Sequence, residues 1–243
     1  AAIVGAGDLG ASIASTLAVR NHLCEIRLID EAGSVAAGKA LDIQQASPIY
    51  GTAVRLVGTT GLEAAATADV LVLADAHGPP SREWEGEAGL QLLRRLVTSN
   101  RHAAVVCAGG RQGWLLERAV VELGLPWSRI LGSAPAALAA GVRGLVAAAA
   151  GVSPHTITLA LAGVPPHQVV VGWEAATVDG SPLTTRLAPQ VIARMDARLR
   201  YLWPPGPISL GVAAALAVEG FLLGARRPLM ALTVPEGARD GDR

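Results

Sequence analysis

The chain opens with Ala1-Ala2-Ile3-Val4-Gly5-Ala6-Gly7-Asp8-Leu9-Gly10, and this stretch decides the fold. The apolar run up to Val4 is typical of a buried parallel strand, and the pattern from Ala11 to Ala18 indicates a helix. In a strand–turn–helix of this kind, the first glycine permits a tight turn, the second lets the backbone approach a pyrophosphate, and the third lets helix and strand pack closely. The unpaired N–H groups at the helix start then face the phosphates. We therefore expect a dinucleotide to contact the turn residues, namely Gly5, Gly7, Asp8, Leu9 and Gly10.

A second apolar run, Glu25 to Ile29, ends in Asp30, about twenty residues past the turn, where dinucleotide-binding folds place a ribose-binding acid. A carboxylate there accepts hydrogen bonds from the ribose diol and repels a 2′-phosphate, which favours NAD over NADP. The neighbouring Arg27 leaves NADP open. An ordinary turn followed by a solvated Asp30 is the alternative interpretation. Asp8 is expected to cap the helix.

Strand and helix patterns alternate through the first half of the chain, which predicts a doubly wound parallel sheet. Further strands are expected at Ala53–Val57, Asp69–Ala74, Ala103–Cys107 and Arg129–Leu131, with helical segments at Ser34–Ala46, Gly61–Ala66, Gly89–Val97 and Trp114–Leu123. The second half differs, with strands expected at Thr156–Ala162 and Val169–Trp173 and helices at Leu187–Tyr201 and Ile208–Leu223. We expect a dinucleotide-binding domain over residues 1–150 and a smaller α+β domain over residues 151–243.

Composition limits the classes of partner. The formal net charge of the 243 residues is zero, which gives no electrostatic case for nucleic acid or an anionic membrane. The apolar stretches Ala134–Val152 and Ile208–Ala225 contain Arg143 and Glu219 and fit buried helices better than membrane spans. Cys24 and Cys107 lack metal-ligand spacing, so we expect no metal and interpret both as small buried residues of a reducing compartment.

A cytoplasmic location is therefore expected, and no signal peptide, because the first residues already form a strand. The polar tail Glu236–Arg243 is expected to be disordered.

Several phrases of the sequence resemble the malate/lactate dehydrogenase family. They are GAGDLGASIA at the start, Leu28–Pro48 with its Gly38-Lys39-Ala40-Leu41-Asp42, Ala68–Leu73, Gly124–Gly132 and Val178–Leu183, in the family's order. The resemblance runs from residue 1 to about residue 235. It implies a Rossmann half, a smaller and here truncated substrate half, NAD, and hydride transfer involving a small-molecule carboxylate. It also implies a homodimer or higher homo-oligomer through helices near Ser34–Ala46 and Ile208–Leu223.

The chemistry that the resemblance implies does not carry over residue by residue. The positions of the family's catalytic His and Asp hold Pro165 and Leu138, and the position of its carboxylate-binding Arg holds Gly141. The family has a second Arg two residues after the carboxylate-binding one, and this Arg is kept as Arg143. An Asn-Pro pair of the family falls on Gly109-Gly110. Leucine and proline cannot exchange a proton, and glycine cannot bind a carboxylate, so the usual reaction has no evident route.

No catalytic residue is therefore assigned, and three candidates stay open. His77 and Arg82 follow the fourth predicted strand at its carboxyl end, where open α/β sheets bind ligands. His167 lies two residues past the lost His position. Asp42 is interpreted as structural.

Two hypotheses follow. In the first, the chain binds NAD(H) without the usual activity and acts as a sensor, regulator or structural subunit. In the second, it is an active oxidoreductase with a rebuilt site for a 2-hydroxy acid such as malate, or a related small substrate. A third, a remnant that has lost NAD binding, is disfavoured by the glycine fingerprint.

Overall fold

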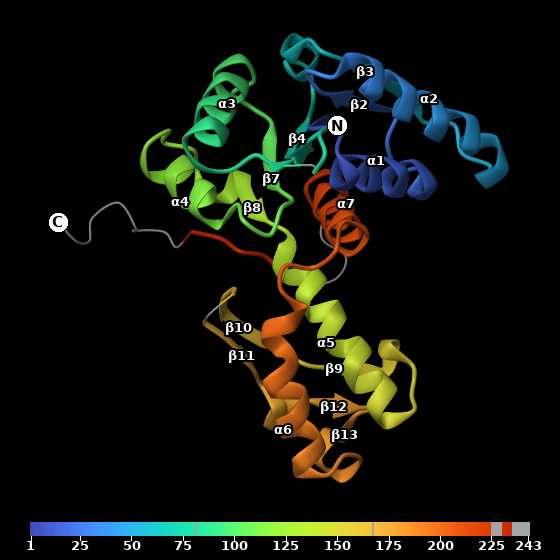
Figure 1. Ribbon diagram of the computed structural model, residues 1–243, viewed down its shortest axis with the longest axis vertical. Coiled ribbons are helices and arrows are strands. Elements are labelled where there is room, and N and C mark those ends of the chain that lie inside the picture. Colours follow the sequence, from blue (N-terminus) through green and yellow to red (C-terminus); the bar gives the residue numbers. More distant parts are fainter. Residues whose placement is uncertain (81, 167, 225–229, 235–243) are drawn as a thin grey trace. The chain divides into compact units, whose positions relative to one another are not determined.

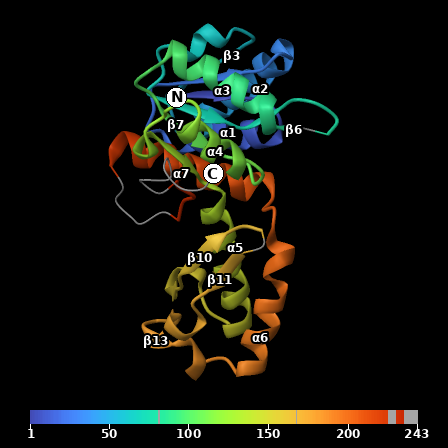
Figure 2. The same cartoon turned by 90° about the vertical axis from the view of Figure 1, so that its left-hand side faces the viewer.

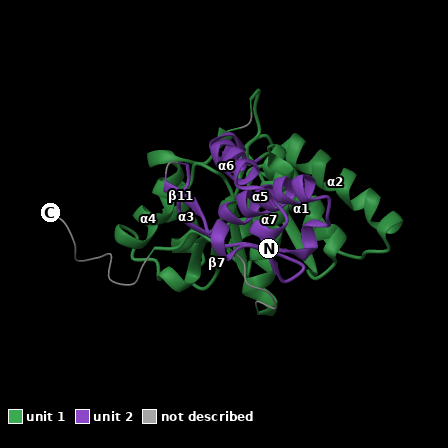
Figure 3. Cartoon of the chain, turned by 90° about the horizontal axis from the view of Figure 1, so that it is seen from below, with its two compact units in different colours: residues 1–134, 206–243 green, residues 135–205 purple. Residues whose placement is uncertain are grey.

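The computed structural model describes residues 1–80, 82–166, 168–224 and 230–234, which form two compact units (Figures 1 and 3). Unit 1 comprises residues 1–134 and 206–243, and unit 2 comprises residues 135–205. This division differs from the expected boundary near Ala150. Helix α5 (Ala134–Ala150) contributes Leu138, Val142 and Val146 to the hydrophobic clusters of unit 2, so the division falls at the start of that helix, after its first residue. The chain then returns to unit 1 at Gly206.

Unit 1 is built on a six-stranded sheet in the order β3-β2-β1-β4-β7-β8, and every neighbouring pair is parallel. This is the strand order of the doubly wound dinucleotide-binding fold. The strands are β1 (Ala2–Val4), β2 (Glu25–Ile29), β3 (Arg55–Thr59), β4 (Val70–Leu73), β7 (Ala104–Cys107) and β8 (Ile130–Gly132). The order reverses between β1 and β4, so ligands of this fold bind at the carboxyl ends of those two strands.

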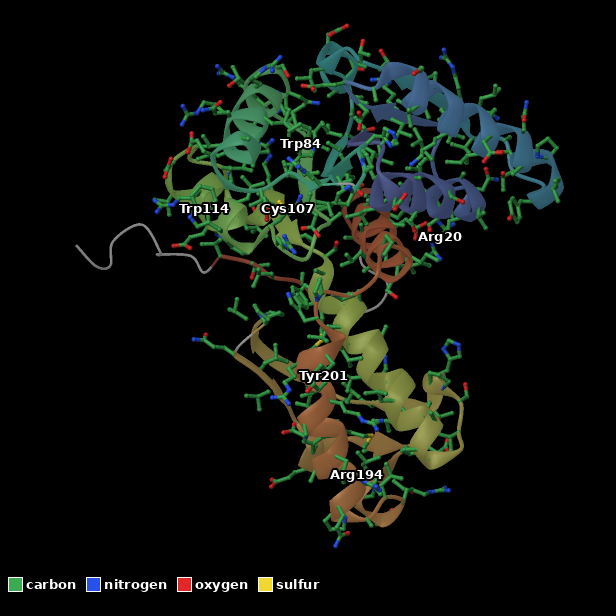
Figure 4. All side chains as sticks on the ribbon, viewed as in Figure 1. Arg20, Trp84, Cys107, Trp114, Arg194 and Tyr201 are labelled. Atoms are coloured by element: carbon green, nitrogen blue, oxygen red, sulfur yellow. The ribbon has the colours of Figure 1, made fainter. Side chains whose placement is uncertain are left out.

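Consecutive residues of β1, β4 and β7 are apolar and almost all buried, so side chains are buried on both faces of this sheet, as is typical of parallel strands. One face packs against α3 (Gly86–Ser99) and α4 (Gly113–Val121), which contribute buried leucines such as Leu93 and Leu115. Cys107, labelled in Figure 4, belongs to this cluster, and burial raises the pKa of its thiol to about 12. The core of unit 1 is therefore a layer of aliphatic side chains between sheet and helices.

Helix α7 (Pro207–Leu223) returns from unit 2 and packs against α1 (Asp8–Arg20) as well as β4 and β7. The two helices approach so closely that a Cβ added at Gly211 would lie 2.2 Å from Ser12 Oγ. Glu219, only 8% exposed, accepts hydrogen bonds from Arg20 Nε at 2.6 Å and from His22 Nδ1 at 2.8 Å. Arg20 lies at the end of α1 next to α7 in Figure 4. Helix α2 (Gly33–Tyr50) covers β2 and β3.

Unit 2 combines α5 and α6 (Pro189–Arg198) with two small antiparallel sheets. One is the hairpin of β10 (Leu161–Val164) and β11 (Gln168–Val171), and the other has the order β13-β12-β9. The strands of the second sheet are β9 (Ile157–Thr158), β12 (Thr177–Val178) and β13 (Ser181–Pro182). Unit 2 is thus α+β, as expected.

Several expectations need correction in detail. The third strand begins and ends two residues later than predicted, because Arg55 to Thr59 pair with the whole of β2. The helical segment expected at 61–66 is a short 3-10 helix, Leu62–Ala65, and 156–162 is divided between two strands. Cys24 is exposed, not buried, because it precedes β2 instead of lying in it. The predicted disordered tail lies outside the described residues.

Among the described residues, no single helix combines the length and apolar composition of a membrane span. The bent pair of residues 189–202 and 207–223 meets that test only when both parts are counted together.

Candidate functional site

The glycine turn between β1 and α1 has the geometry that its sequence predicts. Gly5 adopts φ +111°, a left-handed conformation that favours glycine. A Cβ on Gly10 would lie 1.9 Å from the Gly5 carbonyl oxygen, so only glycine lets α1 start this close to the turn. Gly7 is the residue that precedes the first helical turn. The backbone that would contact a pyrophosphate is therefore present.

The start of α1 already holds a carboxylate of the same chain. Asp75, which follows β4, accepts the Leu9 N–H at Oδ2 over 3.1 Å and the Gly10 N–H at Oδ1 over 2.8 Å. Its backbone carbonyl also accepts the Gly7 N–H at 2.9 Å. Asp75, not Asp8, therefore accepts the N–H groups of Leu9 and Gly10 in the first turn of α1. Asp8 is exposed and is the first residue of the helix, so its expected capping role is wrong.

Asp30 lies at the carboxyl end of β2, as predicted, and is also engaged by the backbone. Its Oδ2 accepts the N–H groups of Ala6 at 2.7 Å and His77 at 2.9 Å, and its Oδ1 accepts that of Ala32 at 2.9 Å. Burial disfavours the charged carboxylate, but these three hydrogen bonds outweigh it, so the pKa of Asp30 lies below its ordinary value. Asp30 is therefore a fixed anion at the side of the turn.

Lys39, the only lysine of the chain, brings a positive charge to the same turn from α2. Its ammonium donates to the carbonyl oxygens of Ala6 at 2.8 Å and Gly7 at 3.0 Å. It thus stabilises the turn, while the carboxylates of Asp30 and Asp75 hold the N–H groups around it.

A short hairpin follows β4 and carries another carboxylate, that of the half-buried Glu83. Its strands β5 (Asp75–Ala76) and β6 (Arg82–Glu83) pair antiparallel with Asp75 opposite Glu83. Glu83 accepts the N–H groups of Gly110 at 3.1 Å and Arg111 at 2.8 Å, in the loop after β7. Burial raises the pKa of Glu83 above its ordinary value, although those two hydrogen bonds oppose the shift. Figure 2 shows β6 and this hairpin at the edge of unit 1.

Gln112 closes the base of the hairpin. Its amide donates to the carbonyl oxygens of Ala74 at 3.3 Å and Trp84 at 3.1 Å, and its Oε1 accepts the Gly109 N–H at 2.9 Å. Gln112 is 1% exposed. Six backbone N–H groups near the carboxyl ends of β1 and β7 are therefore bound by side chains of the chain itself, namely those of Ala6, Leu9, Gly10, Gly109, Gly110 and Arg111.

Of the three catalytic candidates, the structure describes His77 and Arg82, and both are exposed. His77 is exposed, and its backbone N–H bonds Asp30, which places it beside the position expected for the adenosine ribose rather than for a reacting carbonyl. Arg82 is exposed on β6. His167 lies outside the described residues.

In unit 2, the positions that would carry the catalytic pair are apolar. Leu138 is buried, and it lines a cavity of about 330 Å³ together with Pro165, Val169 and Trp203. Asp196 also borders this cavity, but its Oδ1 accepts the indole N–H of Trp173 at 2.7 Å. Gly141 is exposed on α5, and Arg143 is half-buried on the same helix. Arg200 lines the cavity as well, so its charged groups are Asp196 and Arg200, while the two positions of the catalytic pair contribute only apolar side chains.

Sequence reasoning missed Asp75, Glu83, Gln112 and Lys39. A signal existed for two of them, because Asp75 directly follows the central strand and Lys39 is the only lysine. Their partners are 65 and 66 residues away for Asp75 and 32 and 33 for Lys39, so the contacts depend on the tertiary fold. In the part of the chain that the structure describes, no group of three or more His, Cys, Asp or Glu residues could hold a metal ion.

Comparison with known proteins gives consistent results. No family model matches the sequence. The malate dehydrogenase of Thermomicrobium roseum is 29% identical over 252 residues, covering 97% of this chain and 81% of the relative. The malate dehydrogenase structure of Salinibacter ruber superposes with a TM-score of 0.84 at 22% identity, covering 97% of this chain and 80% of that one.

A third match is a lactate dehydrogenase of Cryptosporidium parvum, solved with lactic acid and NAD. It has a TM-score of 0.79 at 19% identity, over 91% of this chain and 76% of that one. At these identities, the two structural matches show the fold.

Proposed function

The chain belongs to the malate/lactate dehydrogenase family, and we propose that within it the chain is a member without the usual hydroxy-acid dehydrogenase activity. Its role would be that of an NAD(H)-binding sensor, regulator or structural subunit. One observation carries this proposal, namely that the two positions where the resemblance places the proton-transferring pair hold apolar side chains. Leu138 and Pro165 face one cavity and neither side chain can hold a proton.

The catalytic contribution of the groups that are absent supports the proposal. A positioned general acid–base contributes ~10²–10⁴-fold to a rate. Gly141 removes a bidentate guanidinium contact with a substrate carboxylate, which a point charge elsewhere does not replace. The groups act as a unit, so the loss of all three is not repaired by one remaining arginine such as Arg143.

NAD(H) is the cofactor that the residues support best. Asp30 is held as an anion at the end of β2, which suits a ribose diol and opposes a 2′-phosphate. Arg27, which left NADP open, donates through Nη1 to Ala64 O and Thr67 Oγ1, each at 2.6 Å, and through Nε to Glu25. With its guanidinium engaged in this way, Arg27 does not favour NADP.

We also propose a homodimer. Helix α7 presents an apolar stripe at four-residue spacing, with Ile208 74%, Val212 41% and Leu216 37% exposed. Exposed apolar side chains on one helix face are typical of a contact surface. A second copy is the occupant that the family resemblance implies.

An activity assay beside a binding titration tests the proposal. We expect no turnover above the protein-free rate with NAD and malate or lactate, or with NADH and oxaloacetate. We expect NADH to bind, and Asp30→Ala to weaken that binding by about tenfold or more, since it removes the ribose acceptor. Asp42→Ala, which removes an exposed carboxylate of α2, is the matched control and should leave binding unchanged. Turnover with any of these substrates would refute the proposal, and absence of NADH binding would remove its cofactor.

A further inference from the structure

The carboxylate of Asp75 lies in the space that the glycine fingerprint keeps open for a ligand. A Cβ built on Gly7 would be 2.2 Å from Asp75 Oδ2 and 2.6 Å from Oδ1. In dinucleotide-binding folds, the second glycine leaves this space so that the pyrophosphate can approach the backbone. Here the same space is filled by an acidic side chain that is only 5% exposed.

Two hydrogen-bond donors of the subsite are engaged as well. Asp75 binds the N–H groups of Leu9 and Gly10, at the positive end of the α1 dipole. A phosphate oxygen and the Asp75 carboxylate cannot bind the same two N–H groups together. Two anions a few ångströms apart also repel each other strongly where water is largely excluded.

The hairpin that carries Asp75 is fixed at its base. Gln112 bonds Ala74 and Trp84, the residues on either side of the hairpin, and Glu83 is anchored on the loop after β7. The backbone of Asp75 also holds the Gly7 N–H. Removal of the carboxylate from α1 therefore requires its side chain to turn away while the hairpin stays in place.

We propose that Asp75 is a built-in competitor for the phosphates of a nucleotide and so determines which ligand charge this site accepts. The inference deepens the proposed function and rests on it for the identity of the ligand site. A phosphate-bearing ligand must displace Asp75 from Leu9 and Gly10, whereas a nucleoside without phosphate need not. Affinity for NAD(H) is thereby kept below the level that the glycine turn alone would give.

Calorimetric titration of the full chain with NADH and with adenosine tests this role. Asp75→Ala should tighten NADH binding by about tenfold or more and leave adenosine binding within about twofold of the wild type. Asp75→Asn removes the charge and keeps the shape, so it should give a smaller gain in the same direction, and it carries the test if the alanine variant does not unfold cooperatively. Asp42→Ala, which makes the same change in net charge on the exposed face of α2, should leave both affinities unchanged.

The outcomes separate this inference from the proposed function. If wild type and Asp75→Ala bind NADH equally well, the competitor role is refuted and the cofactor proposal stands. If NADH and adenosine both gain equally, Asp75 acts on the fold and not on the phosphate, which also refutes the inference. If none of the folded variants binds NADH, the cofactor proposal falls, and the competitor role falls with it.

Discussion

At the residue scale, the site is dominated by acidic side chains that accept backbone N–H groups. Asp30, Asp75 and Glu83 together take seven of them, from Ala6, Ala32 and His77, from Leu9 and Gly10, and from Gly110 and Arg111. A buried carboxylate is stable only when such donors satisfy it. The chain therefore uses the ligand-binding edge of its sheet to stabilise its own charges.

Asp30 makes this arrangement dependent on pH. Its pKa is lowered in the folded state, so its stabilisation is fully present above its unfolded value of about 3.9 and is lost as pH falls through the folded pKa. We expect Asp30→Asn to cost about 2 kcal/mol at neutral pH, because an amide cannot accept all three N–H groups. Urea unfolding of the wild type and Asp30→Asn over a pH series measures the difference in their free energies of unfolding.

The difference in stability between the wild type and Asp30→Asn should shrink as pH falls below about 4. Asp42 is exposed, so the difference in stability between the wild type and Asp42→Asn should not change with pH. A constant difference across the series would contradict the role assigned to the Asp30 carboxylate.

At the scale of elements, the contact between α1 and α7 fixes the returning C-terminal segment on the sheet. Gly211 permits it, since a Cβ there would meet Ser12 Oγ at 2.2 Å and the Ser12 carbonyl carbon at 3.0 Å. Gly220 lies in the same helix, and a Cβ there would meet nothing within 4 Å. The two glycines form a natural pair for comparison.

We expect Gly211→Ala to destabilise the protein by about 1–3 kcal/mol through overpacking. Gly220→Ala should stabilise it by about 0.5–1 kcal/mol, because alanine favours the helix. Chemical unfolding of both variants decides between packing and helix propensity. Equal effects of the same sign would show that α7 does not pack on α1 as described.

Most elements could be predicted from the sequence, because buried parallel strands and amphipathic helices have distinct patterns. The six strands of the large sheet were each expected within two residues, and Asp30 was placed correctly from its distance to the glycine turn. The β5–β6 hairpin was missed because two-residue strands have no periodicity. Asp75 was missed because its partners become neighbours only after β1 and β4 pair.

At the scale of the whole molecule, the exposed stripe on α7 predicts self-association. Light scattering should give twice the 24.8 kDa mass of the chain at micromolar concentration. Val212→Arg places a charge in the stripe and should give the mass of one chain. Val121→Arg changes an equally exposed valine of α4 and should leave the mass unchanged. A wild-type monomer would end the dimer proposal.

The central claim is that Asp75 occupies the space beside Gly7, and a double-mutant cycle of these two residues tests it without any ligand. Gly7 has φ −69°, which alanine adopts freely, and the three atoms nearest to an added Cβ all belong to the Asp75 carboxyl group. Gly7→Ala should therefore destabilise the wild type by about 1–3 kcal/mol and cost much less in the Asp75→Ala background, giving a coupling above about 1 kcal/mol. Additive effects within about 0.5 kcal/mol would show that the carboxylate does not fill this space, and the account would fail.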